Sequence, residues 1–236
     1  MNRPARTDLL VYWTDIRLNE DRLNQYASIL SSDELKRAAR YIFDSDRNRF
    51  IVCRSILRML LGELTNVAPG QLNFSYNEFG KPFLAQQTIE FNLSHSGNFA
   101  VYAFTKDSPV GIDIEKIDAR VDCGGLSRRF FSNTELAELR EIREDLRVKS
   151  FFDCWTRKEA YIKATGRGLS VPLTEFSVPV AGRQNLRLDE DPQWVMYDLA
   201  VHPDYSAAVV AARPSTILLL SDLPASLATF AQPAES

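Results

Sequence analysis

Apolar side chains along the chain recur at two different spacings. Short segments rich in β-branched, aromatic and alternating apolar residues predict strands, because side chains on a strand point alternately to its two faces. These segments are residues 8–14, 72–76, 91–96, 99–104, 111–116, 174–180, 194–201 and 206–213. Segments with apolar residues three or four positions apart predict helices. They cover residues 32–41, 45–62, 132 to about 143, and about 149–164.

The order of these elements repeats in the two halves of the chain. In each half, a helix containing Phe-x-x-Cys precedes a Phe-Ser strand and then a strand of small apolar residues. Cys53 lies 21 residues before Phe74, and Cys154 lies 22 residues before Phe176. Chance could produce this match, and so could an internal duplication. We expect a duplication, and therefore an α+β fold of two similar halves related by pseudo-twofold symmetry, with a ligand cleft between them.

Composition narrows the class of protein. The chain has 236 residues, of which 45% are hydrophobic and 25% charged, as in soluble globular proteins, and this excludes disordered, collagen-like and coiled-coil chains. Its apolar runs, such as residues 207–212, are much shorter than the ~20 residues of a membrane helix. The N-terminus lacks the apolar core of a signal peptide. We therefore expect a cytoplasmic protein without a membrane partner.

Cysteine, histidine and charge exclude further kinds of site. The three cysteines form no Cys-x-x-Cys pair, and two histidines are too few for a multi-histidine metal site. A net charge of −3 gives no reason to expect nucleic-acid binding. The charge is uneven, however, because residues 36–58 contain seven basic and two acidic residues. This segment would suit an anionic ligand, or it would form a basic helix face in solvent.

Residues 110–115, Val-Gly-Ile-Asp-Ile-Glu, alternate apolar and acidic side chains. On a strand, Asp113 and Glu115 would share one face with their Cα atoms ~7 Å apart. At an effective dielectric constant of 20, the two charges would repel by about 2 kcal/mol, and a cation would remove that repulsion. Oxygen ligands without a neighbouring histidine favour Mg²⁺. The alternative is a strand whose polar face lies in solvent.

The predicted helix at residues 149–164 carries Trp155, Glu159 and Lys163 in one stripe, four residues apart. On a surface helix, Glu159 and Lys163 would form an ordinary ion pair worth ~0.3–0.5 kcal/mol. The indole of Trp155 in the same stripe favours a position at a packed boundary instead. There, a carboxylate and a lysine can supply a metal ligand or base together with a cation for a phosphate.

Taken together, these segments resemble the 4′-phosphopantetheinyl transferases. The resemblance rests on the motif Gly111-Ile-Asp-Ile-Glu115 and, after 39 intervening residues, the motif Trp155-x-x-Lys158-Glu159-Ala160-x-x-Lys163. Upstream, Phe79-Gly80-Lys81-Pro82 and Phe91-Asn92-Leu93-Ser94-His95-Ser96 follow the family order. The resemblance covers about residues 30–180. The length is similar to that of the two-halved, monomeric surfactin-synthetase-activating type.

The resemblance implies an activity. The family transfers the phosphopantetheine arm of coenzyme A to a serine of an apo acyl or peptidyl carrier protein, releases adenosine 3′,5′-bisphosphate and uses Mg²⁺. It implies a monomer in which residues 1–108 form a coenzyme A-binding half and residues 109–236 form a catalytic, Mg²⁺-binding half. A non-catalytic module that binds coenzyme A or the carrier, and another Mg²⁺-dependent phosphodiesterase, remain as alternatives.

The resemblance also implies roles for individual residues. Asp113, Glu115 and Glu159 resemble the metal-binding carboxylates, and Glu159 is the candidate base for the carrier serine. Lys163 resembles the lysine that binds the coenzyme and neutralises the leaving phosphate. The other predicted coenzyme contacts are Phe79, Gly80 and Lys81 on the adenine side, Ser94 and His95 at the phosphates, and Arg37 and Arg54 at the 3′-phosphate. Glu135 also lies in a family-like segment, but with Ser132 it forms a capping box, which explains it without a catalytic role.

Overall fold

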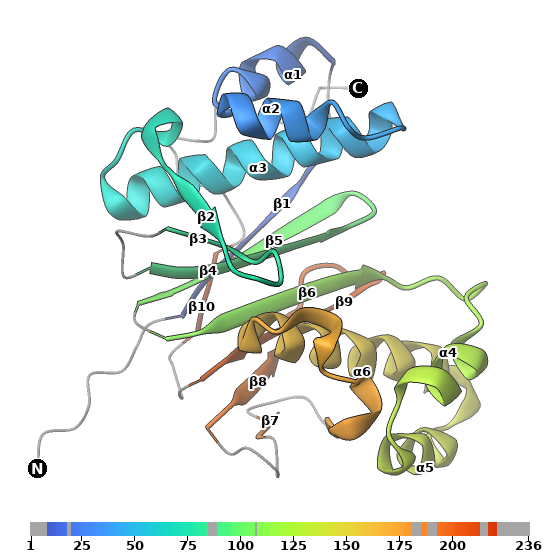
Figure 1. The fold of residues 1–236 in the computed structure, drawn as a ribbon. Helices are drawn as coiled ribbons and strands as arrows, with labels where there is room; N and C mark the ends of the chain where they lie inside the picture. Colours follow the sequence, from blue (N-terminus) through green and yellow to red (C-terminus); the bar gives the residue numbers. More distant parts are fainter. Residues whose placement is uncertain are drawn as a thin grey trace, which may run out of the picture.

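The chain folds into four stacked layers, with a long helix on each outer side and two β-sheets between them (Figure 1). The structure is a computed structural model, and it describes residues 9–17, 20–84, 89–106, 108–180, 186–187, 193–212 and 217–220. Helix α3 (Asp44–Thr65) covers the first sheet, and helix α6 (Glu144–Thr165) covers the second. Each half therefore has its own core, and a third core lies between the sheets.

The first sheet has the strand order β10-β1-β5-β4 within the described residues. Its strands are β1 (Leu9–Asp15), β4 (Ile89–Ser96), β5 (Phe99–Lys106) and β10 (Ile217–Leu220). Strand β5 pairs antiparallel with β1 and β4, whereas β10 pairs parallel with β1. The same half contains α1 (Glu20–Ala27), α2 (Ser32–Ala38), a 3₁₀ helix (Pro69–Gln71) and the hairpin of β2 (Phe74–Tyr76) and β3 (Pro82–Leu84).

The second sheet has the strand order β6-β9-β8-β7, and all of its pairs are antiparallel. Its strands are β6 (Val110–Lys116), β7 (Leu186–Arg187), β8 (Val195–Asp198) and β9 (Tyr205–Ala211). Helices α4 (Cys123–Phe130) and α5 (Asn133–Glu141) precede α6, and 3₁₀ helices at Gly168–Ser170 and Leu173–Glu175 follow it. As predicted, α5 begins with the Ser132–Glu135 capping box.

The two halves repeat one topology, which confirms the predicted α+β fold of two similar halves. In the first half, β1 is followed by α3 and then by β4 and β5, with the spatial order β1-β5-β4. In the second half, β6 is followed by α6 and then by β8 and β9, with the spatial order β6-β9-β8. Both long helices have 22 residues and end at a left-handed residue, Asn66 (φ 56°) or Gly166 (φ 69°). The exception is β10, which returns from the end of the chain to the first sheet.

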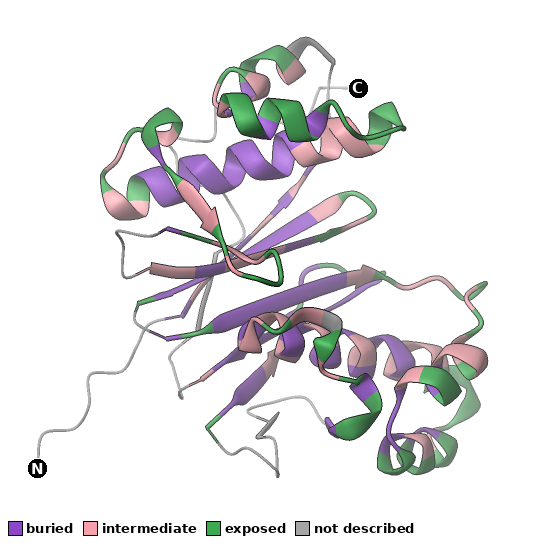
Figure 2. Cartoon of the chain, in the orientation of Figure 1, coloured by how far each residue is buried: buried purple, intermediate pink, exposed green. Residues whose placement is uncertain are grey.

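The core between the sheets holds the halves together. Strands β1 and β5 contribute side chains such as Val11 and Val101, and β6 and β9 contribute Ile112 and Val209; none of these four has exposed surface. Figure 2 shows the facing strands of the two sheets as largely buried. Face-to-face packing of two apolar sheets fixes their relative position. The edge strands of the two sheets are therefore brought together at the junction of the halves.

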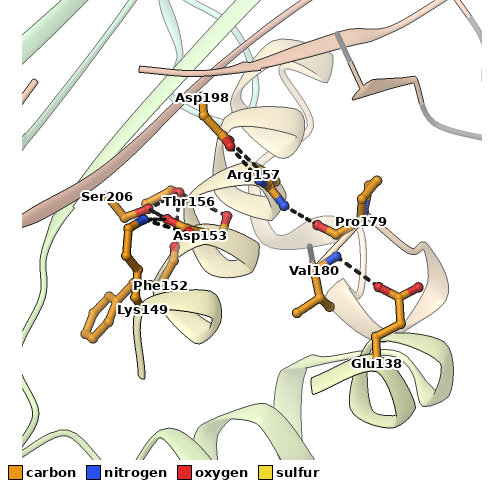
Figure 3. A network of polar contacts seen from close by, with 10 residues as sticks. All are labelled: Glu138, Lys149, Phe152, Asp153, Thr156, Arg157, Pro179, Val180, Asp198 and Ser206. Carbon is orange, nitrogen blue, oxygen red and sulfur yellow. Dashed lines mark hydrogen bonds and ion pairs between the residues drawn. The ribbon is translucent and has the colours of Figure 1, made fainter. Parts of the chain in front are cut away.

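The predicted strand at residues 174–180 is wrong. Residues Leu173–Glu175 form a 3₁₀ helix, and the chain then continues without pairing through residue 180. The backbone N–H of Val178 donates to Glu135 Oε1 at 2.7 Å, and that of Val180 donates to Glu138 Oε2 at 3.0 Å (the latter in Figure 3). Carboxylates of α5 thus satisfy the N–H groups that a neighbouring strand would otherwise bind. Alternation of apolar residues could not reveal these acceptors.

Other predicted boundaries differ by a few residues. The helix predicted from about 149 begins at Glu144, and the strand predicted over 194–201 covers only Val195–Asp198. The motif Phe79-Gly80-Lys81-Pro82 forms the turn before β3 and contributes the first residue of that strand. Helices α1 and α4 were not predicted; α4 contains two consecutive glycines, which lower helix propensity. The tail after Ser221 lies outside the described residues.

The structure also describes the cysteines and the helices, for which the sequence offered no reason to expect a Cys-x-x-Cys site or a membrane helix. All three cysteines are free thiols, and Cys53 and Cys154 are buried. In the described part of the chain, every helix is too short or too polar to cross a lipid bilayer.

Candidate active site

Strands β4 and β6 lie side by side where the two halves meet, although each is the edge strand of its own sheet. Asn92 Oδ1 accepts a hydrogen bond from the backbone N–H of Ile112 at 2.9 Å. Two residues further along β4, Ser94 Oγ donates to Oδ1 of the next residue of β6, Asp113, at 2.8 Å. Side chains of β4 thus bind the open edge of β6. This edge is where the sequence placed the acidic strand.

Ser96 continues the same line of contacts. Its hydroxyl donates to Glu115 Oε2 at 2.8 Å and accepts a hydrogen bond from the backbone N–H of Lys116 at 3.0 Å. Asn92, Ser94 and Ser96 share one face of β4 because side chains on a strand alternate. The polar face of the first half therefore positions both acidic residues of the second half.

Asp113 is the centre of the site. Its side chain is 4% exposed, and its Oδ1 accepts hydrogen bonds from Ser94 and from Lys163 Nζ, the latter at 2.6 Å. Lys163 Nζ also donates to Ser94 Oγ at 3.0 Å. Asp113 Oδ2 is buried without a hydrogen-bond partner among the described residues. A buried carboxylate oxygen without a donor is unfavourable, so this atom is the one that would gain most from a cation.

Gly111 allows β6 to approach α6 closely enough for the Asp113–Lys163 contact. A Cβ atom at this position would lie 2.1 Å from the carbonyl oxygen of Ala160 and 2.3 Å from the backbone nitrogen of Ala164. Both neighbours are helix backbone, so a side chain at position 111 would push α6 away from β6. The glycine of the acidic motif is therefore required by packing.

The three predicted acidic residues influence one another electrostatically. Burial raises the pKa of Glu159, the negative charge of Asp113 raises it further, and Lys163 lowers it. Burial also raises the pKa of Glu115, followed by the charge of Asp113, while the hydrogen bond from Ser96 lowers it. Both glutamates therefore resist ionisation because of their burial and the charge of Asp113.

The three carboxylates do not close around one point. Within the part of the chain that the structure describes, no group of three or more His, Cys, Asp or Glu side chains is close enough to hold a metal ion. The donor set nevertheless fits Mg²⁺, which binds one or two carboxylates and fills its shell with water and phosphate oxygens. The free Asp113 Oδ2 and the repulsion that raises the pKa of Glu115 and Glu159 both favour a cation here.

The turn between β2 and β3 carries the predicted adenine-side contacts Phe79, Gly80 and Lys81. Gly80 has a φ of 82°, which only glycine adopts readily, and Phe79 is 46% exposed. The turn lines a cavity of about 200 Å³ together with Lys163 and Gly166 of the second half. It thus brings the predicted contacts of both halves to one place.

Within this turn, the ammonium of Lys81 contacts the second half directly. Lys81 Nζ donates to the main-chain carbonyl oxygens of Val110 at 3.0 Å and Lys163 at 2.9 Å. Burial lowers the pKa of Lys81. Its assignment to coenzyme A stays a prediction, because the structure gives its charged end two partners in the protein.

Ser94 and His95, both predicted at the coenzyme phosphates, point to opposite sides of β4 because they are consecutive. Ser94 lies with Asp113 and Lys163. The ring of His95 is exposed, yet partial desolvation by neighbouring groups lowers its pKa, and the positive charge of Arg49 on α3 lowers it further. The two residues therefore face different surroundings, and their assignment to the coenzyme phosphates stays a prediction.

Arg37 is exposed and lines a cavity of about 550 Å³ that also includes Lys36 and Arg40. Its guanidinium lies 5.3 Å from the centre of the Phe50 ring and 5.9 Å from that of Tyr76. Cation–π contacts of this kind hold a guanidinium in place without using its N–H donors. Arg37 is therefore open to an anion, and its assignment to the 3′-phosphate stays a prediction.

Arg54, the other predicted 3′-phosphate contact, is 5% exposed. Its Nε lies 3.1 Å from Glu34 Oε1, and its Nη2 donates to the hydroxyl of Tyr76 at 2.7 Å. Burial lowers its pKa, while Tyr76 and Glu34 raise it. The structure thus gives Arg54 partners inside the first half, and its role at a phosphate stays a prediction.

The sequence did not single out Asn77, Asn92 or Ser96 as site residues. Asn92 and Ser96 could have been found from Ser94, because positions 92, 94 and 96 lie on one face of a strand. Asn77 Nδ2 donates to the carbonyl oxygen of Gly166 at 2.8 Å, across the junction. No local pattern indicates a contact between residues 89 positions apart.

Two family models match the chain, one on each half. Residues 13–107 match the model described as "4'-phosphopantetheinyl transferase, N-terminal". Residues 109–210 match the model described as "4'-phosphopantetheinyl transferase superfamily". The two matches leave only residue 108 between them, and they follow the two repeated units of the fold.

Whole-chain relatives agree with these models. The 4′-phosphopantetheinyl transferase HetI of Nostoc sp. (strain PCC 7120) is 40% identical over 197 residues, which are 82% of this chain and 83% of the relative. The 4′-phosphopantetheinyl transferase Sfp of Bacillus subtilis (strain 168) is 31% identical over 206 residues, 86% of this chain and 91% of the relative. The 4′-phosphopantetheinyl transferase ffp of Bacillus subtilis is 32% identical over 86% of this chain and 91% of its own length. The chain therefore belongs to the 4′-phosphopantetheinyl transferase family and is an enzyme of the two-halved, Sfp-like type.

Proposed function

We propose that this enzyme transfers the 4′-phosphopantetheine group of coenzyme A to a serine hydroxyl of an apo acyl or peptidyl carrier protein. The observation that carries the proposal is the position of Lys163, whose ammonium binds Asp113 and Ser94 and lies on the same helix face as Glu159. A cation, an anchored carboxylate and a base candidate at the junction of two halves are what phosphoryl transfer requires.

In the proposed reaction, the serine oxygen forms a bond to the β-phosphorus of coenzyme A. The bond from that phosphorus to the bridging oxygen on the adenosine side breaks, and adenosine 3′,5′-bisphosphate leaves with the electron pair. Glu159 accepts the serine proton, directly or through a water. Lys163 supplies positive charge beside the leaving phosphate.

The cofactor that we propose is Mg²⁺, held by Asp113, Glu115 and Glu159. When bound, it would neutralise charge on the pyrophosphate of coenzyme A. Ser94 and Ser96 support this arrangement, since each donates to a carboxylate of the set and so orients it in advance.

For coenzyme A, we propose a position along the junction, with residues 1–108 supplying most contacts and residues 109–236 supplying the catalytic groups. Arg37 and the basic cavity around it suit the 3′-phosphate, since arginine matches phosphate oxygens well. The smaller cavity beside Phe79 and Gly80 suits the adenine. Lys163 is the contact that we assign to the pyrophosphate.

For the carrier protein, we propose docking on the exposed loop between α2 and α3. Ile42 is 89% exposed and Phe43 is 67% exposed, an unusual degree for large apolar side chains. In the sequence, Arg40 precedes them and Arg47 follows them within the basic segment 36–58, which would suit an acidic carrier with an apolar recognition helix. The Ile42→Asp substitution should raise KM for the carrier and leave KM for coenzyme A unchanged. A KM for the carrier equal to that of the wild-type enzyme would refute this assignment.

We further propose that the enzyme acts as a cytoplasmic monomer.

Intact mass spectrometry tests the proposed reaction. The enzyme is incubated with coenzyme A, Mg²⁺ and a panel of apo carriers, and a gain of one phosphopantetheine on a carrier supports the proposal. Binding of coenzyme A without transfer to any carrier would favour a non-catalytic binding module. Release of a nucleotide without modification of a carrier would favour a phosphodiesterase.

A further inference from the structure

Lys81 joins three segments that are distant in the sequence. It projects from the β2–β3 turn of the first half, and its ammonium donates to the carbonyl oxygens of Val110, at the start of β6, and Lys163, in the last turn of α6. The negative charge of Glu90 raises the pKa of Lys81, but burial, which lowers it, has the larger effect. Two of the three N–H donors of Lys81 are thus used by main-chain carbonyl oxygens of the other half.

The Lys163 carbonyl needs a donor from outside its helix. Carbonyl groups in the last turn of an α-helix have no partner within the helix. Near the end of α6, Ile162 O accepts from the hydroxyl of Thr165, Lys163 O accepts from Lys81, and Gly166 O accepts from Asn77. Two of these three donors belong to the turn of the first half. This turn therefore caps the helix that carries the catalytic residues.

We propose that Lys81 is a positioning residue that fixes Lys163 against Asp113 across the junction of the two halves. The backbone of Lys163 is held by Lys81, while its ammonium is held by Asp113 and Ser94. Lys81 also binds the first residue of the strand that carries Asp113, so one ammonium sets the spacing between the two catalytic segments. This role differs from the adenine contact that the family resemblance implies. It rests on the proposed role of Lys163 in the reaction.

The first experiment separates positioning from coenzyme binding. Lys81→Met keeps the aliphatic stem and removes the donors. The proposal predicts that kcat at saturating coenzyme A falls by about tenfold or more, as expected for displaced catalytic groups. The Kd of adenosine 3′,5′-bisphosphate, measured by titration calorimetry, should change by less than about twofold. A raised Kd with an unchanged kcat would overturn the proposal in favour of a direct adenine contact.

A double-mutant cycle with Lys163→Ala separates positioning from a merely structural role. If Lys81 acts through Lys163, Lys81→Met should lower kcat in the wild-type background and have little effect in the Lys163→Ala background. The same fold loss in both backgrounds would overturn the proposal. An unchanged kcat for Lys163→Ala alone would refute the proposed function of Lys163, and this inference with it, whatever Lys81→Met does.

Asn77→Asp provides a second variant, should Lys81→Met fail to fold. The substitution keeps the Oδ1 acceptor for the N–H groups of Phe79 and Lys81 and removes the donor to Gly166. The proposal predicts a smaller kcat loss that also disappears in the Lys163→Ala background. A loss that is independent of Lys163 would count against the proposal in the same way.

Discussion

The ammonium of Lys163 lies 2.6 Å from Oδ1 of Asp113, and Ser94 donates to the same oxygen. Helix α6, strand β6 and strand β4 thus meet at one carboxylate, although Ser94 and Lys163 are 69 residues apart. The other oxygen of Asp113 is buried without a partner. This arrangement explains why the site needs both halves of the chain, and it leads to the following predictions.

Asp113→Ala should abolish transfer while leaving the fold intact. The substitution removes a proposed metal ligand. It also removes a buried carboxylate of which only Oδ1 has hydrogen-bond partners among the described residues. Transfer is measured by the mass gain of a carrier, and the fold by circular dichroism. Asp118→Ala is the control, because Asp118 pairs with Arg120 on the surface shortly after β6. Normal transfer by Asp113→Ala would contradict the assignment.

Lys163→Ala should lower kcat by roughly 10²–10³-fold, in the range found when one preorganised donor to a developing charge is removed. KM for the carrier should stay the same, because Lys163 faces Asp113 rather than the surface loop assigned to the carrier. Steady-state kinetics with both substrates measures the two constants. Lys149→Ala is the matched control on the same helix, since Lys149 pairs with Asp153. An unchanged kcat would remove Lys163 from the mechanism.

The sequence predicted the acidic strand and the helix that carries Trp155, Glu159 and Lys163 because both have strict local spacing. Asp113 acts electrostatically on both Glu115 and Glu159 and pairs with Lys163, but the grouping of these residues in one site was implied by the family resemblance and not by local spacing. Contacts between halves could not be predicted in this way. The hydrogen bonds from Lys81 to main-chain carbonyls and the burial of Arg54 against Glu34 depend on how the two sheets pack, and packing leaves no local signal.

Lys158→Met should destabilise the fold by about 3–5 kcal/mol, because it leaves a buried charge without its partner. Lys158 and Glu135 are both almost completely buried, with Nζ 2.6 Å from Oε1. Urea unfolding at neutral pH measures the free energy of unfolding. Lys149→Met is the control, since its ion pair is partly exposed and should contribute at most about 1 kcal/mol. If the two variants were equally stable, the Lys158–Glu135 ion pair would not have the stabilising role that its burial indicates.

Gly111→Ala should destabilise the fold by about 1–3 kcal/mol or more, since the added methyl would overlap the backbone of α6. Because α6 would be displaced from β6, kcat should fall as well. Thermal unfolding and transfer kinetics measure the two effects. Gly70→Ala serves as control, because nothing lies within 4 Å of its Cβ position. A Gly111→Ala variant with wild-type stability would show that β6 and α6 are less closely packed than the distances at Gly111 indicate.

The binding of Mn²⁺ in place of Mg²⁺, followed by electron paramagnetic resonance in the presence of coenzyme A, tests the central claim that three carboxylates share one divalent ion. The wild-type enzyme should bind one Mn²⁺ per chain. Asp113→Ala, Glu115→Gln and Glu159→Gln should each weaken binding on the order of tenfold or more. Glu141→Gln, at the exposed end of α5, should leave it unchanged. Wild-type affinity in Glu159→Gln would contradict the account, because α6 would then take no part in holding the ion.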